Sequence, residues 1–163
     1  MSDRFILIVE DERAVRDAIA RDIRMFTPAF RTEVTEDAAD ARAVLAEIAG
    51  RGDEVALVLC DHLLPGERGT DCLIALEQDP DTRPMRKVLI TGQAGHDDTI
   101  RAINEARLDH YIAKPWDPAE LQQVVSDELT EWVLANADDV LPYVAILDGA
   151  RLMERLRTRP SAD

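Results

Sequence analysis

The sequence has no long apolar run. None of its apolar segments approaches the roughly 20 consecutive residues that a membrane-spanning helix needs. Its first residues, Met-Ser-Asp-Arg, also lack the charged start and apolar stretch of a secretory signal peptide. These two absences exclude a transmembrane helix of ordinary length, and we expect a cytoplasmic protein with no membrane partner.

Basic residues are scarce. The chain has 19 Lys and Arg against 33 Asp and Glu, which gives a formal net charge of −14. Nucleic-acid binding depends on Lys and Arg that neutralise phosphates, and anionic lipid attracts the same residues. We therefore expect no nucleic-acid partner and no attraction to a lipid surface.

Cysteine is also rare. The two cysteines, Cys60 and Cys72, form neither a CxxC pair nor a metal-binding spacing. Both fall inside predicted secondary structure, where a free thiol is usually a small buried apolar group. A dithiol redox site is therefore excluded, and the absence of GxGxxG leaves no dinucleotide-binding fingerprint.

The most informative segment that is present is the apolar run Val55–Cys60. It contains no polar residue, ends at Asp61 and is followed by the turn signal Pro65-Gly66. Such a run is typical of a parallel strand buried on both faces. Open α/β sheets bind ligands at the carboxyl ends of their strands, so Asp61 is a candidate functional residue.

Apolar runs and helical patterns alternate along the chain. The predicted strands cover residues 5–9, 31–36, 55–60, 87–91 and 111–113. The predicted helices cover residues 15–26, 37–49, 69–77, 97–107 and 118–136, with Ile100 and Ile103 as the apolar seam of the fourth. This alternation predicts an α/β fold, a five-stranded parallel sheet of flavodoxin-like topology with helices on both faces.

Polar side chains follow four of these strands. Glu10 and Asp11 follow the first, Asp61 the third and Lys114 the fifth, while Thr91 ends the fourth. Each of them alone is an ordinary cap, turn or surface residue, but parallel strands bring all of them to one edge of the sheet. Carboxylates there suit Mg²⁺, and a carboxylate nucleophile beside a lysine suits phosphoryl transfer.

These residues lie in motifs that resemble the receiver domain of two-component response regulators. The matching segments are residues 6–12, 60–66, 88–92 and 109–116, and the resemblance covers about residues 4–135. Thr91 and Lys114 follow Asp61 by 30 and 53 residues, which is also the spacing of the family.

The resemblance implies a role for each matching position. Asp61 would accept a phosphoryl group from a histidine kinase or phosphotransfer protein, with Lys114 and Thr91 contacting that group. Mg²⁺ would be held by Asp11 and Asp61, by Glu10 through water, and by the backbone carbonyl of Leu63. The chain would have no enzymatic activity beyond its own phosphorylation and dephosphorylation.

The resemblance also implies how a signal leaves the domain. Thr91 and Tyr111 would form a switch pair, and residues 97–107, 109–113 and 118–136 would bind a downstream protein partner. Residues 103–118 are most similar to receivers joined to thioredoxin-reductase-like flavoproteins, and less closely to those joined to cyclic-dinucleotide phosphodiesterases. No such effector is present in this sequence.

Three positions depart from the common family pattern. Arg68 stands where an acidic residue is frequent before Gly69, which changes the surface charge beside the site. Glu10 replaces the usual aspartate, and its longer side chain still allows coordination through water. Leu63 is apolar where many members have a polar side chain. Fewer groups would then position an attacking water, which predicts a long-lived phosphoryl form.

The chain divides into a predicted receiver domain at residues 1–136 and a short helical extension at residues 137–163. The extension is apolar and basic, and its pattern predicts one or two short helices broken near Gly149. Three roles are open: packing on its own domain, dimerisation, or a link to a missing domain. A homodimer through the helices 97–107 and 118–136 is also open.

Two other classes compete with a single-domain response regulator. A haloacid-dehalogenase-like phosphatase also uses an aspartate nucleophile and Mg²⁺, but it has a second aspartate where this chain has Leu63. A pseudo-receiver would act only by interaction, yet Asp11, Asp61, Thr91 and Lys114 are all present.

Overall fold

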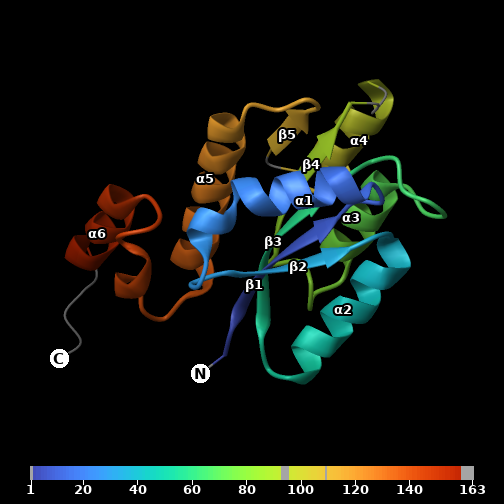
Figure 1. The fold of residues 1–163 in the computed structure, drawn as a ribbon. Helices are drawn as coiled ribbons and strands as arrows, with labels where there is room; N and C mark the ends of the chain where they lie inside the picture. Colours follow the sequence, from blue (N-terminus) through green and yellow to red (C-terminus); the bar gives the residue numbers. More distant parts are fainter. Residues whose placement is uncertain (1, 93–95, 109, 159–163) are drawn as a thin grey trace.

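The strands form one parallel sheet, as predicted. The computed structural model describes residues 2–92, 96–108 and 110–158, so Asp109 of the fourth matching segment lies outside the described residues. The sheet has five strands in the order β2-β1-β3-β4-β5 (Figure 1). This is the flavodoxin-like order. The strands are β1 (Arg4–Val9), β2 (Arg31–Thr35), β3 (Glu54–Cys60), β4 (Arg86–Thr91) and β5 (His110–Ala113).

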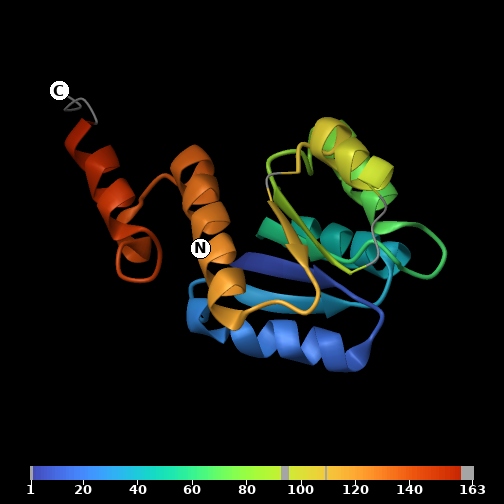
Figure 2. The same ribbon diagram turned by 90° about the horizontal axis from the view of Figure 1, so that it is seen from above.

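Helices cover both faces of the sheet. Figure 2 shows α1 and α5 on one side and α2, α3 and α4 on the other. Among the described residues, no helix is long and apolar enough to cross a membrane. The helices are α1 (Arg13–Asp22), α2 (Ala38–Gly50), α3 (Gly69–Gln78), α4 (His96–Glu105), α5 (Pro118–Asn136) and α6 (Gly149–Thr158), with 3-10 turns η1 (Arg24–Phe26) and η2 (Leu141–Tyr143).

The central strands are apolar on both faces because each face meets a helical layer. Ile6 and Ile8 of β1 pack with residues of α1 and α5, whereas Leu7 and Val9 pack with residues of α2, α3 and α4. Cys60 lies in the second of these clusters with Cys72, and both thiols are buried as predicted. Burial raises the pKa of Cys72 to about 11.

The first helix is shorter than the predicted span of residues 15–26. Helix α1 ends at Asp22, and the chain continues through Ile23 into η1. The amide of Phe26 donates to the Ile23 carbonyl at 3.1 Å, an i→i+3 bond that tightens the last turn. Ile23 and Phe26 are both buried, so the apolar pattern identified the correct face but not the change of helix type.

The predicted apolar seam of the fourth helix is wrong. Ile100 and Ile103 of α4 are 42% and 50% exposed, whereas Ala102 and Ala106 are fully buried. Helix α4 packs against α3, and the small alanine side chains at this contact leave the isoleucines on the outer surface. Two large apolar residues therefore lie exposed on α4.

As far as Thr158, the C-terminal extension packs on its own domain. Tyr143 of η2 and Leu152 of α6 are buried in one apolar cluster with Phe30 and Trp132. The Tyr143 ring lies 5.4 Å from that of Phe30, and the Arg4 guanidinium lies 5.8 Å from the Trp132 and Tyr143 ring centroids. Both views place α6 beside α5, on the side away from the sheet (Figures 1 and 2).

Polar contacts hold the same interface together. The amide of Asp148 donates to the Thr130 hydroxyl of α5 at 3.2 Å, and Arg151 forms an ion pair with Glu131. Arg155 donates to the backbone carbonyl of Leu134 at 2.6 Å. The extension therefore enlarges the core beside α5.

Replacing Leu152 tests whether this packing stabilises the domain. Leu152→Ala leaves a cavity in the cluster, and we expect the free energy of unfolding to fall by about 2–5 kcal/mol. The adjacent, exposed Met153 on the same helix is the control, and Met153→Ala should change stability by less than about 0.5 kcal/mol. Urea unfolding followed by tryptophan fluorescence measures both, and equal effects of the two variants would contradict docking of α6.

Candidate functional site

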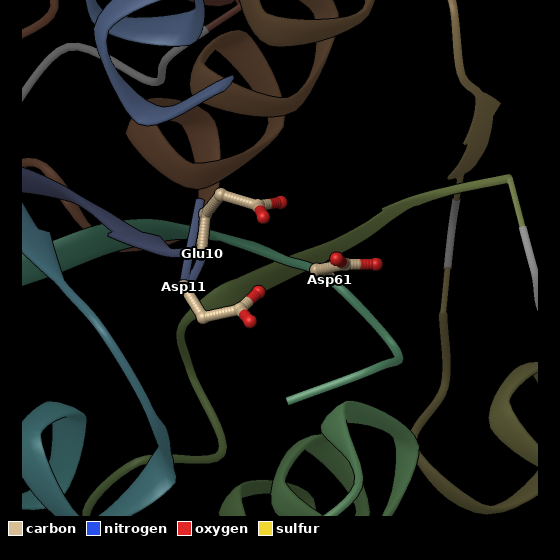
Figure 3. Close-up of side chains that lie close together, drawn as sticks. All are labelled: Glu10, Asp11 and Asp61. Carbon is tan, nitrogen blue, oxygen red and sulfur yellow. The ribbon is translucent and has the colours of Figure 1, made fainter. Parts of the chain in front are cut away.

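Three carboxylates meet at the carboxyl edge of the sheet. Glu10 and Asp11 directly follow β1, and Asp61 directly follows the neighbouring strand β3 (Figure 3). The Asp61 amide donates to the Val9 carbonyl at 3.0 Å, which fixes the two strand ends side by side. Carboxylate oxygens of the three residues lie within 4.8 Å of one another. Glu10 and Asp61 are buried and Asp11 is exposed.

Lys114 supplies a cation to this cluster. It follows β5, and its Nζ lies 2.8 Å from Glu10 Oε2 and 3.0 Å from Asp61 Oδ2. Its own amide donates to the Thr91 carbonyl at 3.4 Å. The ammonium is therefore shared by two carboxylates that are 51 residues apart in sequence.

Burial and ion pairing set the charges of this group. Burial raises the pKa of Glu10 to about 7, although the hydrogen bond from Lys114 acts in the opposite direction. Burial alone would lower the pKa of Lys114, but its hydrogen bonds and its charge attraction to Glu10 and Asp61 together outweigh burial, so that this pKa is raised. Lys114 thus keeps its proton at neutral pH, whereas Glu10 takes up a proton near pH 7.

Thr91 and Tyr111 lie on the neighbouring strands β4 and β5. Thr91 is the last residue of β4 and is buried, whereas Tyr111 of β5 is 39% exposed. The Tyr111 hydroxyl donates to the backbone carbonyl of Thr91 at 3.0 Å. The same carbonyl accepts the Lys114 amide, so one peptide group links the tyrosine to the site.

The loop from β3 to α3 contains contacts that the sequence motifs did not reveal. The amide of His62 donates to Asp61 Oδ1 at 2.7 Å, and the His62 ring Nδ1 lies 3.2 Å from the Thr70 hydroxyl. The Gly69 amide donates to the His62 carbonyl at 2.8 Å. Between these contacts Leu63 has a side chain that is 49% exposed.

The loop after Lys114 is tied to the end of α1. The Trp116 indole donates to Asp22 Oδ2 at 2.9 Å, and the Gln122 amide side chain donates to the Asp22 backbone carbonyl at 2.9 Å. The Asp117 side chain caps α5, because it accepts a hydrogen bond from the Ala119 amide at 3.0 Å. These contacts hold the chain that follows Lys114 against the end of α1 and at the start of α5.

The donor set fits a hard divalent cation. All three side chains offer carboxylate oxygen, which Mg²⁺ prefers over nitrogen or sulfur. One of the three is exposed, which leaves a route for a cation and its waters. Within the part of the chain that the structure describes, this is the one group of three acidic, histidine or cysteine side chains close enough to share an ion.

Comparisons with known proteins agree with this geometry. Residues 6–126 match the family model of the response regulator receiver domain. The hydrogenase transcriptional regulatory protein HoxA of Cupriavidus necator is 33% identical over 128 residues, which are 77% of this chain and 24% of that protein. The phosphate regulon transcriptional regulatory protein PhoB of Pseudomonas aeruginosa is 31% identical over 74% of this chain and 49% of its own length.

Solved structures share the fold. A CheY-like response regulator receiver domain protein from Methanospirillum hungatei has a TM-score of 0.68 and 27% identity, covering 80% of this chain and 97% of that one. The signal receiver domain of an HD domain-containing protein from Pseudomonas fluorescens has a TM-score of 0.72 at 23% identity, covering 85% of this chain and 96% of its own. The chain spans 24% of HoxA and 49% of PhoB, which are thus much longer proteins.

The raised pKa of Glu10 predicts a pH-dependent stability in the absence of divalent cations. Folded protein keeps a proton on Glu10 between pH 4.5 and about 7, whereas unfolded protein does not, so stability falls as pH rises through this window. Glu10→Gln should remove that loss and be more stable than wild type by up to about 3 kcal/mol at pH 8. Near pH 5 wild type and Glu10→Gln should have the same free energy of unfolding. Urea unfolding in EDTA measures this free energy for both proteins at both pH values. A stability difference that is equal at pH 5 and pH 8 would contradict the assignment to Glu10.

Proposed function

The chain belongs to the response regulator receiver domain family, and on this premise we propose that Asp61 accepts a phosphoryl group from a histidine kinase or phosphotransfer protein. The observation that supports this most strongly is the environment of Asp61. Asp61 directly follows a buried parallel strand, and its carboxylate lies 3.0 Å from the Lys114 ammonium. Carboxylate oxygens of Asp61, Glu10 and Asp11 lie within 4.8 Å of one another.

The chemistry follows from these positions. A carboxylate oxygen of Asp61 attacks phosphorus, the bond from phosphorus to the donor's imidazole nitrogen breaks, and an acyl phosphate forms. Lys114 balances the charge of the phosphoryl oxygens, and the Thr91 hydroxyl donates to one of them. Mg²⁺ held by Asp11 and Asp61, by Glu10 through water and by the Leu63 carbonyl would supply further positive charge there.

The proposed output is a protein-binding surface on α4, β5 and α5. Movement of Thr91 toward the phosphoryl group would free space into which the exposed Tyr111 ring can turn. Ile100 and Ile103 lie exposed on α4 in the same part of the molecule and offer an apolar contact for a downstream protein. A partner that prefers one position of Tyr111 shifts the population toward it.

The scope of the proposal is a single-domain regulator that works through protein contacts in the cytoplasm. With a net charge of −14 it would bind neither nucleic acid nor membrane, and it would catalyse only its own phosphorylation and dephosphorylation. A homodimer through α6, or through α4 and α5, would be compatible with this role.

Phosphorylation at Asp61 is tested with acetyl phosphate and Mg²⁺. Wild type should gain the mass of one phosphoryl group in intact mass spectrometry, and Asp61→Asn should not, because an amide oxygen is a far weaker nucleophile. The exposed Asp17 on α1 is the control, and Asp17→Asn should be phosphorylated like wild type. A wild type that gains no mass from acetyl phosphate or from a kinase would instead favour a pseudo-receiver.

The exposed Leu63 predicts a slow loss of the phosphoryl group. Leu63→Asn adds a polar side chain two residues after Asp61, where it can position an attacking water, and hydrolysis should become several-fold faster. Leu141→Asn makes the same change at an exposed position on η2 and should leave the rate unchanged. The rate is the decay of the phosphorylated mass after the donor is removed. Hydrolysis that is no faster in Leu63→Asn than in wild type would contradict this explanation.

A further inference from the structure

We propose that His62 and Thr70 are positioning residues that lock the β3–α3 loop around the phosphoacceptor. The inference rests on the proposed function of Asp61. Its basis is the side-chain contact between His62 Nδ1 and the Thr70 hydroxyl, 3.2 Å apart across the loop. His62 is next to Asp61 in sequence, and Thr70 lies in the first turn of α3.

Both side chains of this contact are buried, which makes the contact costly to open. Thr70 has no exposed surface and His62 is almost completely buried. A buried hydroxyl or imidazole that loses its partner keeps the full cost of its lost hydration, so opening the contact is unfavourable. The pair therefore holds the start of the loop against the start of α3.

The backbone closes the loop at the same place. The Gly69 amide donates to the His62 carbonyl at 2.8 Å, and a Cβ added at Gly69 would lie 1.7 Å from the Asp61 carbonyl oxygen. The Cys60 thiol lies 3.2 Å from that same oxygen. The backbones at the two ends of the loop are thus in direct contact. The His62–Thr70 contact adds a side-chain link at the same place, and we name this side-chain contact the loop clasp.

The loop clasp acts on the groups that are expected to meet the metal and the phosphoryl group. The His62 amide holds Asp61 Oδ1 at 2.7 Å, while Lys114 holds Oδ2 at 3.0 Å. Leu63, the expected carbonyl ligand, is the next residue after His62. Mg²⁺ requires near-ideal octahedral geometry, so a loosened clasp should weaken its binding before it affects the fold.

Thr70→Val tests the clasp because it removes the hydroxyl at nearly constant volume. We expect the Mg²⁺ dissociation constant, from a titration followed by amide NMR shifts, to rise about tenfold. Phosphorylation by acetyl phosphate at subsaturating Mg²⁺ should slow by a similar factor and recover at high Mg²⁺. Thr70→Ser keeps the hydroxyl and should remain within about twofold of wild type in both measurements.

Thr130→Val is the matched control for a merely structural effect. Thr130 is also fully buried, donates to the Ser126 carbonyl at 2.7 Å and accepts the Asp148 amide, but it lies on α5 against the extension. Thr130→Val should lower the urea midpoint of unfolding as Thr70→Val does, and it should leave the Mg²⁺ dissociation constant unchanged. His62→Leu combined with Thr70→Val should weaken Mg²⁺ binding by less than the sum of the two single effects, because both changes remove the contact between these two side chains.

The outcomes separate the two proposals. A wild type that neither binds Mg²⁺ nor gains a phosphoryl group overturns the proposed function and the clasp with it. A wild type that does both, with Thr70→Val and Thr130→Val alike in Mg²⁺ affinity, overturns the clasp alone. Weakened binding that appears equally in Thr70→Ser also overturns it, since that variant retains the hydroxyl.

Discussion

The sharing of one ammonium by two buried carboxylates is the interaction on which the rest of the site depends. Lys114 contacts Glu10 and Asp61 at 2.8 and 3.0 Å, and in doing so it joins the loops that follow β1, β3 and β5. Buried carboxylates of like charge repel one another and lose hydration, so they need this cation or a metal ion beside them. The pKa of Glu10 is raised because one ammonium does not fully offset the cost of burying its charge.

Strand β1 connects this site with the C-terminal extension. At the strand's amino end the Arg4 guanidinium lies 5.8 Å from the ring centroids of Trp132 and Tyr143, and at its carboxyl end the chain passes into Glu10. The amino end is thus packed by α5 and the extension, and the carboxyl end by the ion pairs of the site. An interior strand that is held at both ends is a suitable base for a site that must keep carboxylates close together.

The sequence predicted the sheet and the converging site because both depend on strong, local signals. Unbroken apolar runs mark buried strands, and polar residues at their ends meet through parallel topology alone. The errors occurred where tertiary packing decides. The apolar pattern suggested that Ile100 and Ile103 face the core, but in the close packing of α4 on α3 the alanines face it instead. His62 and Thr70 are eight residues apart in the sequence, and their contact depends on the path of the loop between them, which no residue pattern specifies.

The proposed phosphorylation would change the balance around Lys114 in a definite direction. A phosphoryl group adds about −1.5 to −2 charge beside Asp61, more than a carboxylate carries, so it competes with Glu10 for the same ammonium. The Lys114 amide and the Tyr111 hydroxyl both donate to the Thr91 carbonyl, at 3.4 and 3.0 Å. A shift of Lys114 or Thr91 toward the new charge therefore disturbs the acceptor that holds Tyr111. Coupling between the site and the exposed Tyr111 on β5 therefore needs no longer path than this one peptide group.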